Sequence, residues 1–238
     1  MGLSVIKRHH PGGFMNTRKL LAACAVSITA FAAIDAAAVP IVGLVNTGAN
    51  STAGQQDTNY SLTKTGGNGP AIGSYGYESS GAGFPFGPWL ANSSTSQWLT
   101  PLANAGQTFD SNAAGIYTWT LQFDLTGYDP ASAFFGGRWA TDNSGTILLN
   151  GSTLLNPSTG FTAWSSFSST GGNFNAGLNT LQFVVTNLQQ NGGNPTGLRV
   201  EFTQSDVTAV PEPATLSLFA LGLAGLGFAR RRNASRRV

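Results

Sequence analysis

The segment "YTWTLQFDL", residues 117–125, decides the fold class of this chain. Apolar and polar side chains alternate along it without interruption, so that one face carries Tyr, Trp, Leu, Phe and Leu and the other carries Thr, Thr, Gln and Asp. A period of two over nine residues predicts a strand with one buried face. The segments "LQFVV" at 181–185 and "LRVEF" at 198–202 repeat the pattern, and both are predicted to be strands.

The remainder of residues 39–209 supports an all-β fold. Shorter strand candidates lie at 39–45, 59–63 and 146–150, and turns rich in Gly, Asn and Pro separate them. Glycine contributes 31 of the 238 residues and charged residues only 9%, which suits many tight turns. Half-buried strands need a second layer to cover their apolar faces, so we expect an antiparallel, jelly-roll-like β-sandwich.

The composition of residues 39–209 excludes several functions. This span contains no His and no Cys, so disulfides, Cys/His zinc sites, Ser-His-Asp triads and cysteine nucleophiles are excluded. Its only basic residues are Lys64, Arg138 and Arg199, against eight acidic ones. A mildly acidic span without a basic patch argues against binding to nucleic acid.

The first 38 residues have the layout of a signal peptide, which we expect to form a helix in the precursor. Basic residues at 18–19 precede an apolar run at 20–34, and Ala36 and Ala38 satisfy the small-x-small rule for cleavage after Ala38. The unusual stretch before Met15 suggests that translation begins at Met15.

The C-terminal end, "VPEPATLSLFALGLAGLGFARRR" at 210–232, has three parts in order. These are the triplet Pro211, Glu212 and Pro213, an apolar segment at 214–229, and the cluster Arg230, Arg231 and Arg232. The apolar segment predicts a short transmembrane helix of about 24 Å, and the arginines predict that its end, with the basic tail 233–238, stays cytoplasmic.

These three parts resemble a PEP-CTERM sorting signal. The resemblance implies a bacterial protein that is exported, held in the inner membrane as a precursor, and cut near the Pro-Glu-Pro triplet by an exosortase-like transpeptidase. The mature protein is then expected in the cell envelope or in an extracellular polysaccharide matrix, with that polysaccharide as a possible partner.

Residues 116–203 resemble lectin-like and galactose-binding-like β-sandwiches of bacterial surface proteins. The resemblance lies in the segments 136–154, 160–168 and 174–187, and it concerns the fold more than the ligand. If a sugar binds, the turns at one end of the sandwich predict Asp142, Asn143, Asn150 and Trp164 as its contacts. The "DNSG" turn at 142–145 would allow Ca²⁺ only with help from backbone carbonyls, so no metal site and no cofactor is assigned.

Carboxylates are the remaining option for acid–base chemistry in residues 39–209. Asp124 and Glu201 are predicted on the polar, solvated faces of their strands, and Asp129 and Asp142 in turns. We therefore expect a non-enzymatic protein that binds carbohydrate. The alternatives are a structural or adhesive surface protein without a defined ligand, and a carboxylate-dependent glycoside-active enzyme.

Overall fold

The computed structural model describes residues 37–49, 51–79, 84–154, 157–158, 160–211, 219, 221–227 and 230. The expected signal peptide lies outside the described residues except for its last two alanines. The strands are β1 (Ala38–Val39), β2 (Gln56–Gly66), β3 (Tyr75–Glu78), β4 (Leu99–Thr100), β5 (Gly115–Asp124), β6 (Tyr128–Asp142), β7 (Ser144–Leu149), β8 (Ser152–Leu154), β9 (Ser165–Thr170), β10 (Leu178–Asn187) and β11 (Gly197–Ala209).

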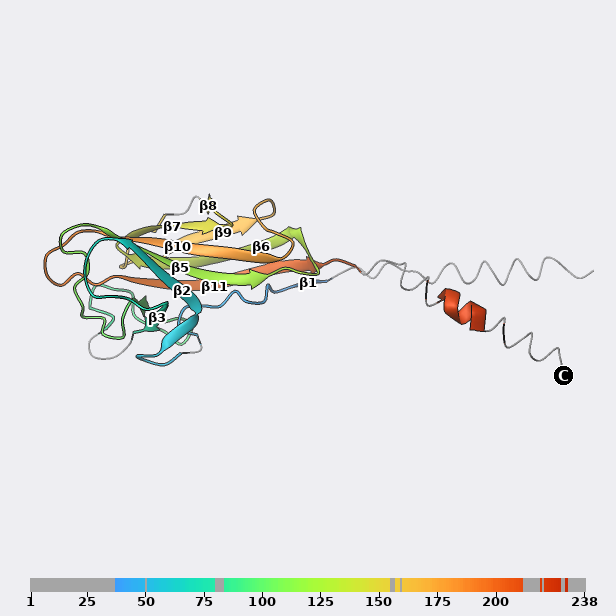
Figure 1. The fold of residues 1–238 in the computed structure, drawn as a ribbon, viewed down its shortest axis with the longest axis horizontal. Helices are drawn as coiled ribbons and strands as arrows, with labels where there is room; N and C mark the ends of the chain where they lie inside the picture. The colour runs from blue at the N-terminus through green and yellow to red at the C-terminus, as the bar shows by residue number, and fades with distance from the viewer. Residues whose placement is uncertain are drawn as a thin grey trace, which may run out of the picture. The chain divides into compact units, whose positions relative to one another are not determined.

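All the strand pairs are antiparallel, and together they form one continuous sheet in the order β8-β7-β10-β5-β2-β3-β4-β11-β6-β9. The short strands β3 and β4 join the two halves of this path. The halves face each other as the two layers of a sandwich, with β5 and β10 in one and β6 and β11 in the other (Figure 1). The predicted all-β antiparallel sandwich is therefore confirmed.

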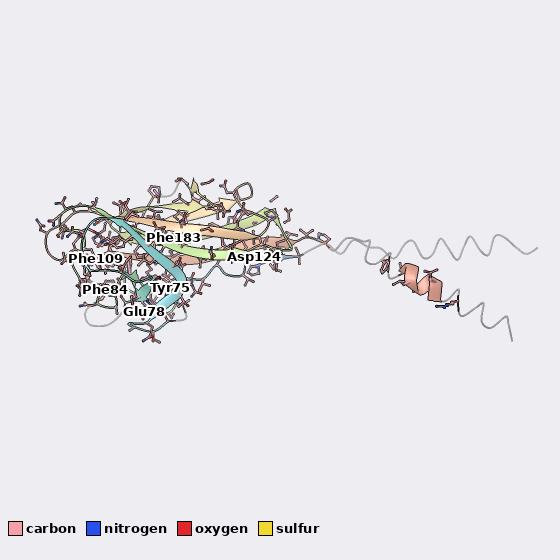
Figure 2. The ribbon with its side chains drawn as sticks, viewed as in Figure 1. Tyr75, Glu78, Phe84, Phe109, Asp124 and Phe183 are labelled. Atoms are coloured by element: carbon pink, nitrogen blue, oxygen red, sulfur yellow. The ribbon has the colours of Figure 1, made fainter. Side chains whose placement is uncertain are left out.

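Aromatic rings fill the space between the layers. Phe183 of β10 is fully buried, and its ring centroid lies 5.7 Å from that of Trp139 on β6 and 5.9 Å from that of Phe167 on β9 (Figure 2). The ring centroid of Tyr60 on β2 lies 6.3 Å from that of Phe183. One side chain thus contacts rings from three other strands, two of them in the opposite layer.

The sequence predicted the strands in which apolar and polar residues alternate, and it missed β3, β4, β8 and β9, which are short or contain few apolar residues. β5, β10, β11, β2 and β7 all form where the sequence indicated strands. The candidate at 39–45 shrinks to β1, because the chain turns at Val42 and Gly43. β6 was not predicted at its full length of 15 residues, because residues 139–142 are buried on both faces and give no alternation.

The two ends of the sandwich domain lie side by side. Ala38 of β1 pairs with Thr208 of β11, and β11 ends at Ala209, directly before the Pro-Glu-Pro triplet. In the tail, residues 219, 221–227 and 230 are helical. Within the part of the chain that the structure describes, no helix is both long and apolar enough to cross a membrane. The predicted transmembrane segment falls largely on residues outside that part.

We predict that Phe183→Ala lowers the free energy of unfolding by about 3–5 kcal/mol, because a cavity would open between the layers. Ile116→Ala on β5, where the side chain is 41% exposed, should cost less than about 1 kcal/mol. Urea denaturation of the purified variants measures both values. Equal losses at the two positions would contradict the assignment of Phe183 to the centre of the core.

Candidate functional site

A hollow of about 480 Å³ lies where β6 ends and β11 begins. Loops that are distant in sequence form its walls, and the turn after β6 forms its floor. The lining residues are Phe86, Pro88, Trp89, Gly106, Asp142, Asn143, Phe161, Gln190, Gly193, Asn194 and Pro195. We call this hollow the Asp142 pocket.

Among the described residues, Asp142 is the only acidic one that lines this pocket. It is 5% exposed, and its Oδ1 has no hydrogen-bond partner among the described residues. Burial raises the pKa of this carboxyl to about 7, because no nearby positive charge offsets the loss of solvation. Near neutral pH the group can therefore either accept or donate a hydrogen bond.

The apolar wall of the pocket consists of aromatic rings. The rings of Trp89 and Phe161 stack with their centroids 5.6 Å apart and an interplanar angle of 28°. Phe86 meets Trp89 edge-on at 6.0 Å. A backbone hydrogen bond of 2.9 Å from Leu90 N to Phe161 O joins the two loops that carry these rings.

The amide side chains at the rim are held in place. Asn143 Oδ1 accepts a hydrogen bond of 2.7 Å from Leu188 N, which fixes the orientation of its Nδ2. Asn194 donates through Nδ2 to Phe109 O and to Leu188 O, and it is 3% exposed. Gln190 is exposed at the opening. The pocket thus combines fixed polar groups with aromatic surface.

The structure separates the four residues that the sequence suggested for sugar binding. Asp142 and Asn143 line the pocket, whereas Asn150 follows the far end of β7. There Asn150 donates to Asn173 O and accepts from Thr180 N, so both ends of its amide maintain a turn.

Trp164 lies between two guanidinium groups, which are 4.6 Å (Arg138) and 4.7 Å (Arg199) from its ring centroid. Both arginines also pair with Glu201, at 2.6 Å and 3.3 Å. Glu201 is 3% exposed, so the prediction that it faces solvent was wrong. Burial alone would raise the pKa of Glu201, but hydrogen bonds from Ser96 and Arg138 and the two positive charges outweigh it and lower the pKa. This cluster maintains the structure of β6 and β11 and leaves Trp164 outside the Asp142 pocket.

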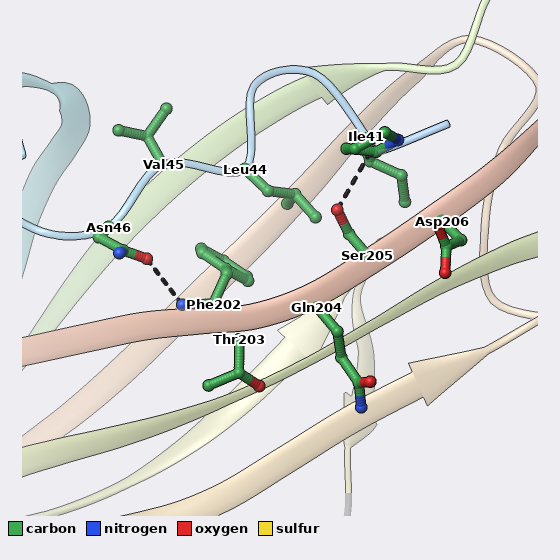
Figure 3. A pocket seen from close by; sticks show the side chains of 10 residues that line it. Ile41, Leu44, Val45, Asn46, Phe202, Thr203, Gln204, Ser205 and Asp206 are labelled. Atoms are coloured by element: carbon green, nitrogen blue, oxygen red, sulfur yellow. Dashed lines mark hydrogen bonds between the residues drawn. The ribbon is translucent and has the colours of Figure 1, made fainter. Parts of the chain in front are cut away.

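A second hollow, of about 600 Å³, is an open groove between residues 40–46 and β11 (Figure 3). Hydrogen bonds tie its two sides together, from Ile41 N to Ser205 Oγ at 3.1 Å and from Phe202 N to Asn46 Oδ1 at 2.7 Å. Asp206 is its only carboxylate. It lacks the buried carboxyl and the stacked rings of the Asp142 pocket, so we regard the smaller hollow as the better candidate.

The remaining predicted features have separate places. Asp124 is exposed, as predicted, and accepts hydrogen bonds from the backbone and side chain of Thr126. Over the described ranges, no three His, Cys, Asp or Glu side chains gather closely enough to hold a metal ion. The "DNSG" turn presents only the Asp142 carboxylate, so Ca²⁺ at this turn stays an untested expectation.

The chain was compared with known proteins. Residues 209–232 match the PEP-CTERM protein-sorting motif. The predicted sorting signal is thereby confirmed, and the motif implies an exported protein that a membrane exosortase processes. It covers the Pro-Glu-Pro triplet and the cluster Arg230–Arg232.

No curated protein matches the sequence. Among solved structures, the chain is similar to the CBM36-1 domain of a multidomain xylanase from the hindgut metagenome of Trinervitermes trinervoides, with 11% identity, a TM-score of 0.27, and coverage of 64% of this chain and 98% of that one. It is also similar to a GH31 alpha-xylosidase from Xanthomonas citri, with 12% identity, a TM-score of 0.21, and coverage of 42% and 12%. Scores this low carry no argument about function.

We predict that Asp142→Asn raises the stability of the protein, and by more at pH 8 than at pH 5. An unfolded Asp has a pKa near 3.9, so between about pH 4 and pH 7 the folded protein holds a proton that the unfolded chain has lost. The stability of the wild type therefore falls as the pH rises through this window, by at most about 4 kcal/mol.

Melting temperatures of both proteins at pH 5 and pH 8 measure the effect. Asp124→Asn is the control, because that carboxyl is exposed and its pKa is lowered by the hydrogen bonds from Thr126. A wild type whose melting temperature is no lower at pH 8 than that of Asp142→Asn would contradict the prediction.

Proposed function

We propose that this chain is an exported, non-catalytic protein that binds carbohydrate in the Asp142 pocket. The observation that supports this most is a buried carboxyl with an unpartnered oxygen, on a residue that lines the same hollow as the stacked rings of Trp89 and Phe161. The sorting motif implies export, and polysaccharide is abundant outside bacterial cells.

The chemistry of a sugar fits both kinds of surface. The C–H groups on one face of a pyranose ring are apolar and pack against an aromatic ring, while the hydroxyls donate and accept hydrogen bonds. Asp142 offers a carboxyl oxygen, and the fixed amide of Asn143 offers Nδ2. A few placed polar groups beside aromatic surface are typical of small-molecule sites.

Two observations favour binding over hydrolysis. Glycoside hydrolysis generally uses a pair of carboxylates about 5 to 10 Å apart, and Asp142 is the only acidic residue among those that line the pocket. Asp124 ends β5, and Asp129 lies in β6 rather than in the predicted turn; both are exposed, and their carboxylates accept hydrogen bonds from Thr126 N and Ala131 N. A structural or adhesive role without a ligand remains the second candidate, and the sorting motif is equally compatible with it.

We predict that the purified protein binds an oligosaccharide on a glycan array, with an affinity that calorimetry can measure. Phe161→Ala should weaken binding at least tenfold, because it removes one ring of the stacked pair. Asp142→Asn should remove the change in affinity between pH 6 and pH 8, because the carboxyl titrates in that range.

Asp206→Asn, in the open groove, serves as the matched control and should bind like the wild type. Absence of binding to every sugar at millimolar concentration would reject the carbohydrate proposal and leave the structural role. An equal loss of affinity in Asp206→Asn would indicate that carbohydrate binds in the open groove instead of the Asp142 pocket.

We further propose that the exosortase cuts the chain near Pro211–Pro213 and that the mature protein lacks residues 214–238. Two described features support a cut there. β11 ends at Ala209, so the triplet lies directly after the sandwich, and Val210 N still bonds to Gly127 O at 2.9 Å. Pro211, the first residue of the triplet, therefore directly follows the hydrogen-bonded residue Val210, without a linker.

We predict that Glu212→Ala blocks processing, so that the uncut precursor accumulates in the membrane fraction. Intact mass of the wild-type surface protein should correspond to a chain without residues 214–238. A double change of Arg236 and Arg237 to Ala lies outside the matched motif and should leave processing unchanged. A surface form that still carries Arg230–Arg232 would show that the tail is a permanent anchor.

A further inference from the structure

Buried oxygen atoms without partners gather beside Gly48. Among the described residues, ten buried side-chain N or O atoms lack a hydrogen-bond partner. Four of these atoms are oxygens of three residues near Gly48. They are the two carboxylate oxygens of Glu78, Oε1 of Gln97 and Oγ of Ser51. Glu78 itself is 2% exposed, so no bulk water solvates its carboxylate (Figure 2).

Gly48 is the residue that these side chains share. A Cβ atom at Gly48 would lie 2.5 Å from Gln97 Cβ and 3.2 Å from Glu78 Cγ, so any larger residue would occupy this space. Ser51 N donates to Gly48 O at 3.4 Å, and Gly48 N donates to Asp57 Oδ2 at 2.8 Å. Gly48 also has a positive φ of 70°, which glycine adopts without strain.

The charge around Gly48 is negative and uncompensated. Asp57 is 2% exposed, and its oxygens accept hydrogen bonds from Gly48 N and from Asn59. The ion pairs within the described ranges involve Asp110 and Glu201, so neither Asp57 nor Glu78 has a basic partner. A buried carboxylate without a partner is costly, and Gln97 Oε1 cannot relieve the cost because an amide oxygen only accepts hydrogen bonds.

We propose that Glu78, Gln97 and Ser51 form a calcium site beside Gly48, with the charge of Asp57 supporting it. A divalent cation supplies the missing positive charge and accepts all four unpartnered oxygens at once. Ca²⁺ prefers six to eight oxygen ligands, among them bidentate carboxylates, amide oxygens and water, in flexible geometry. A site with one free carboxylate, one amide and one hydroxyl suits Ca²⁺ better than Mg²⁺, which demands a stricter octahedron.

The site would join parts of the chain that are far apart in sequence. Ser51 follows the N-terminal segment, Glu78 ends β3, and Gln97 precedes β4. Backbone hydrogen bonds already connect these parts, from Gln97 N to Thr47 O at 2.8 Å and from Glu78 N to Gln55 O at 2.8 Å. Bound calcium therefore stabilises the fold here, independently of the Asp142 pocket and of carbohydrate binding.

Calcium titration of the chelator-treated full chain tests the proposal. We expect one Ca²⁺ per chain by calorimetry, and a melting temperature about 5–10 °C higher at a hundredfold excess of Ca²⁺ over its dissociation constant. Tb³⁺ in place of Ca²⁺ should show sensitised emission, because Trp98 and Tyr77 are the sequence neighbours of two ligands.

Glu78→Gln should abolish the Ca²⁺-dependent shift and the Tb³⁺ emission, while its own melting temperature in chelator is at or above that of the wild type because the uncompensated charge is gone. Gln97→Ala, which removes the amide ligand, is a second variant with the same expected loss if Glu78→Gln does not fold. Asp124→Asn, at an exposed carboxylate, is the control and should keep the full response. Retention of the shift in both site variants, its loss in the control, an equal response to Mg²⁺, or no calcium binding by the wild type would each overturn the proposal.

Discussion

The structure depends on aromatic packing between two layers that come from one folded sheet. Phe183 meets rings from β2, β6 and β9, and its strand pairs along ten residues with β5, where Phe183 lies opposite Trp119. A slip of one residue in this ladder would turn Phe183 and the other apolar side chains of its face away from the core. The packing of the rings therefore depends on the strand register. The loops that carry the candidate site are attached to this core, which fixes their positions.

Because basic residues are scarce, only some of the buried acidic residues have a basic partner. Lys64 pairs with the buried Asp110 at 3.4 Å, and Arg138 and Arg199 pair with the buried Glu201. All the basic side chains between residues 39 and 209 are thus committed to structural carboxylates. Among the described residues, the other buried acids, which include Glu78 and Asp142, have no basic partner.

Local pattern predicted the strands, and partners distant in sequence determined the rest. The alternation at 117–125 yields β5 because one face of that strand is buried, whereas residues 139–142 of β6 are covered on both sides and leave no periodic signal. The "DNSG" sequence at 142–145 predicted that Asp142 lies at the candidate site. The second wall of its pocket was not predictable, because Phe161 reaches Leu90 only through tertiary pairing. Glu201 looked solvated because the sequence does not reveal that Arg199 and Arg138 lie beside it.

The pairing of β6 with β11 has a geometrical consequence. At one end of this ladder Gly197 lies opposite Asp142, and at the other Ala209 lies opposite Tyr128. Thirteen residues of β11 separate the two ends, a length of about 40 Å in extended strand. The Asp142 pocket and the residue that precedes the C-terminal triplet therefore lie at opposite ends of one strand, separated by about its full length.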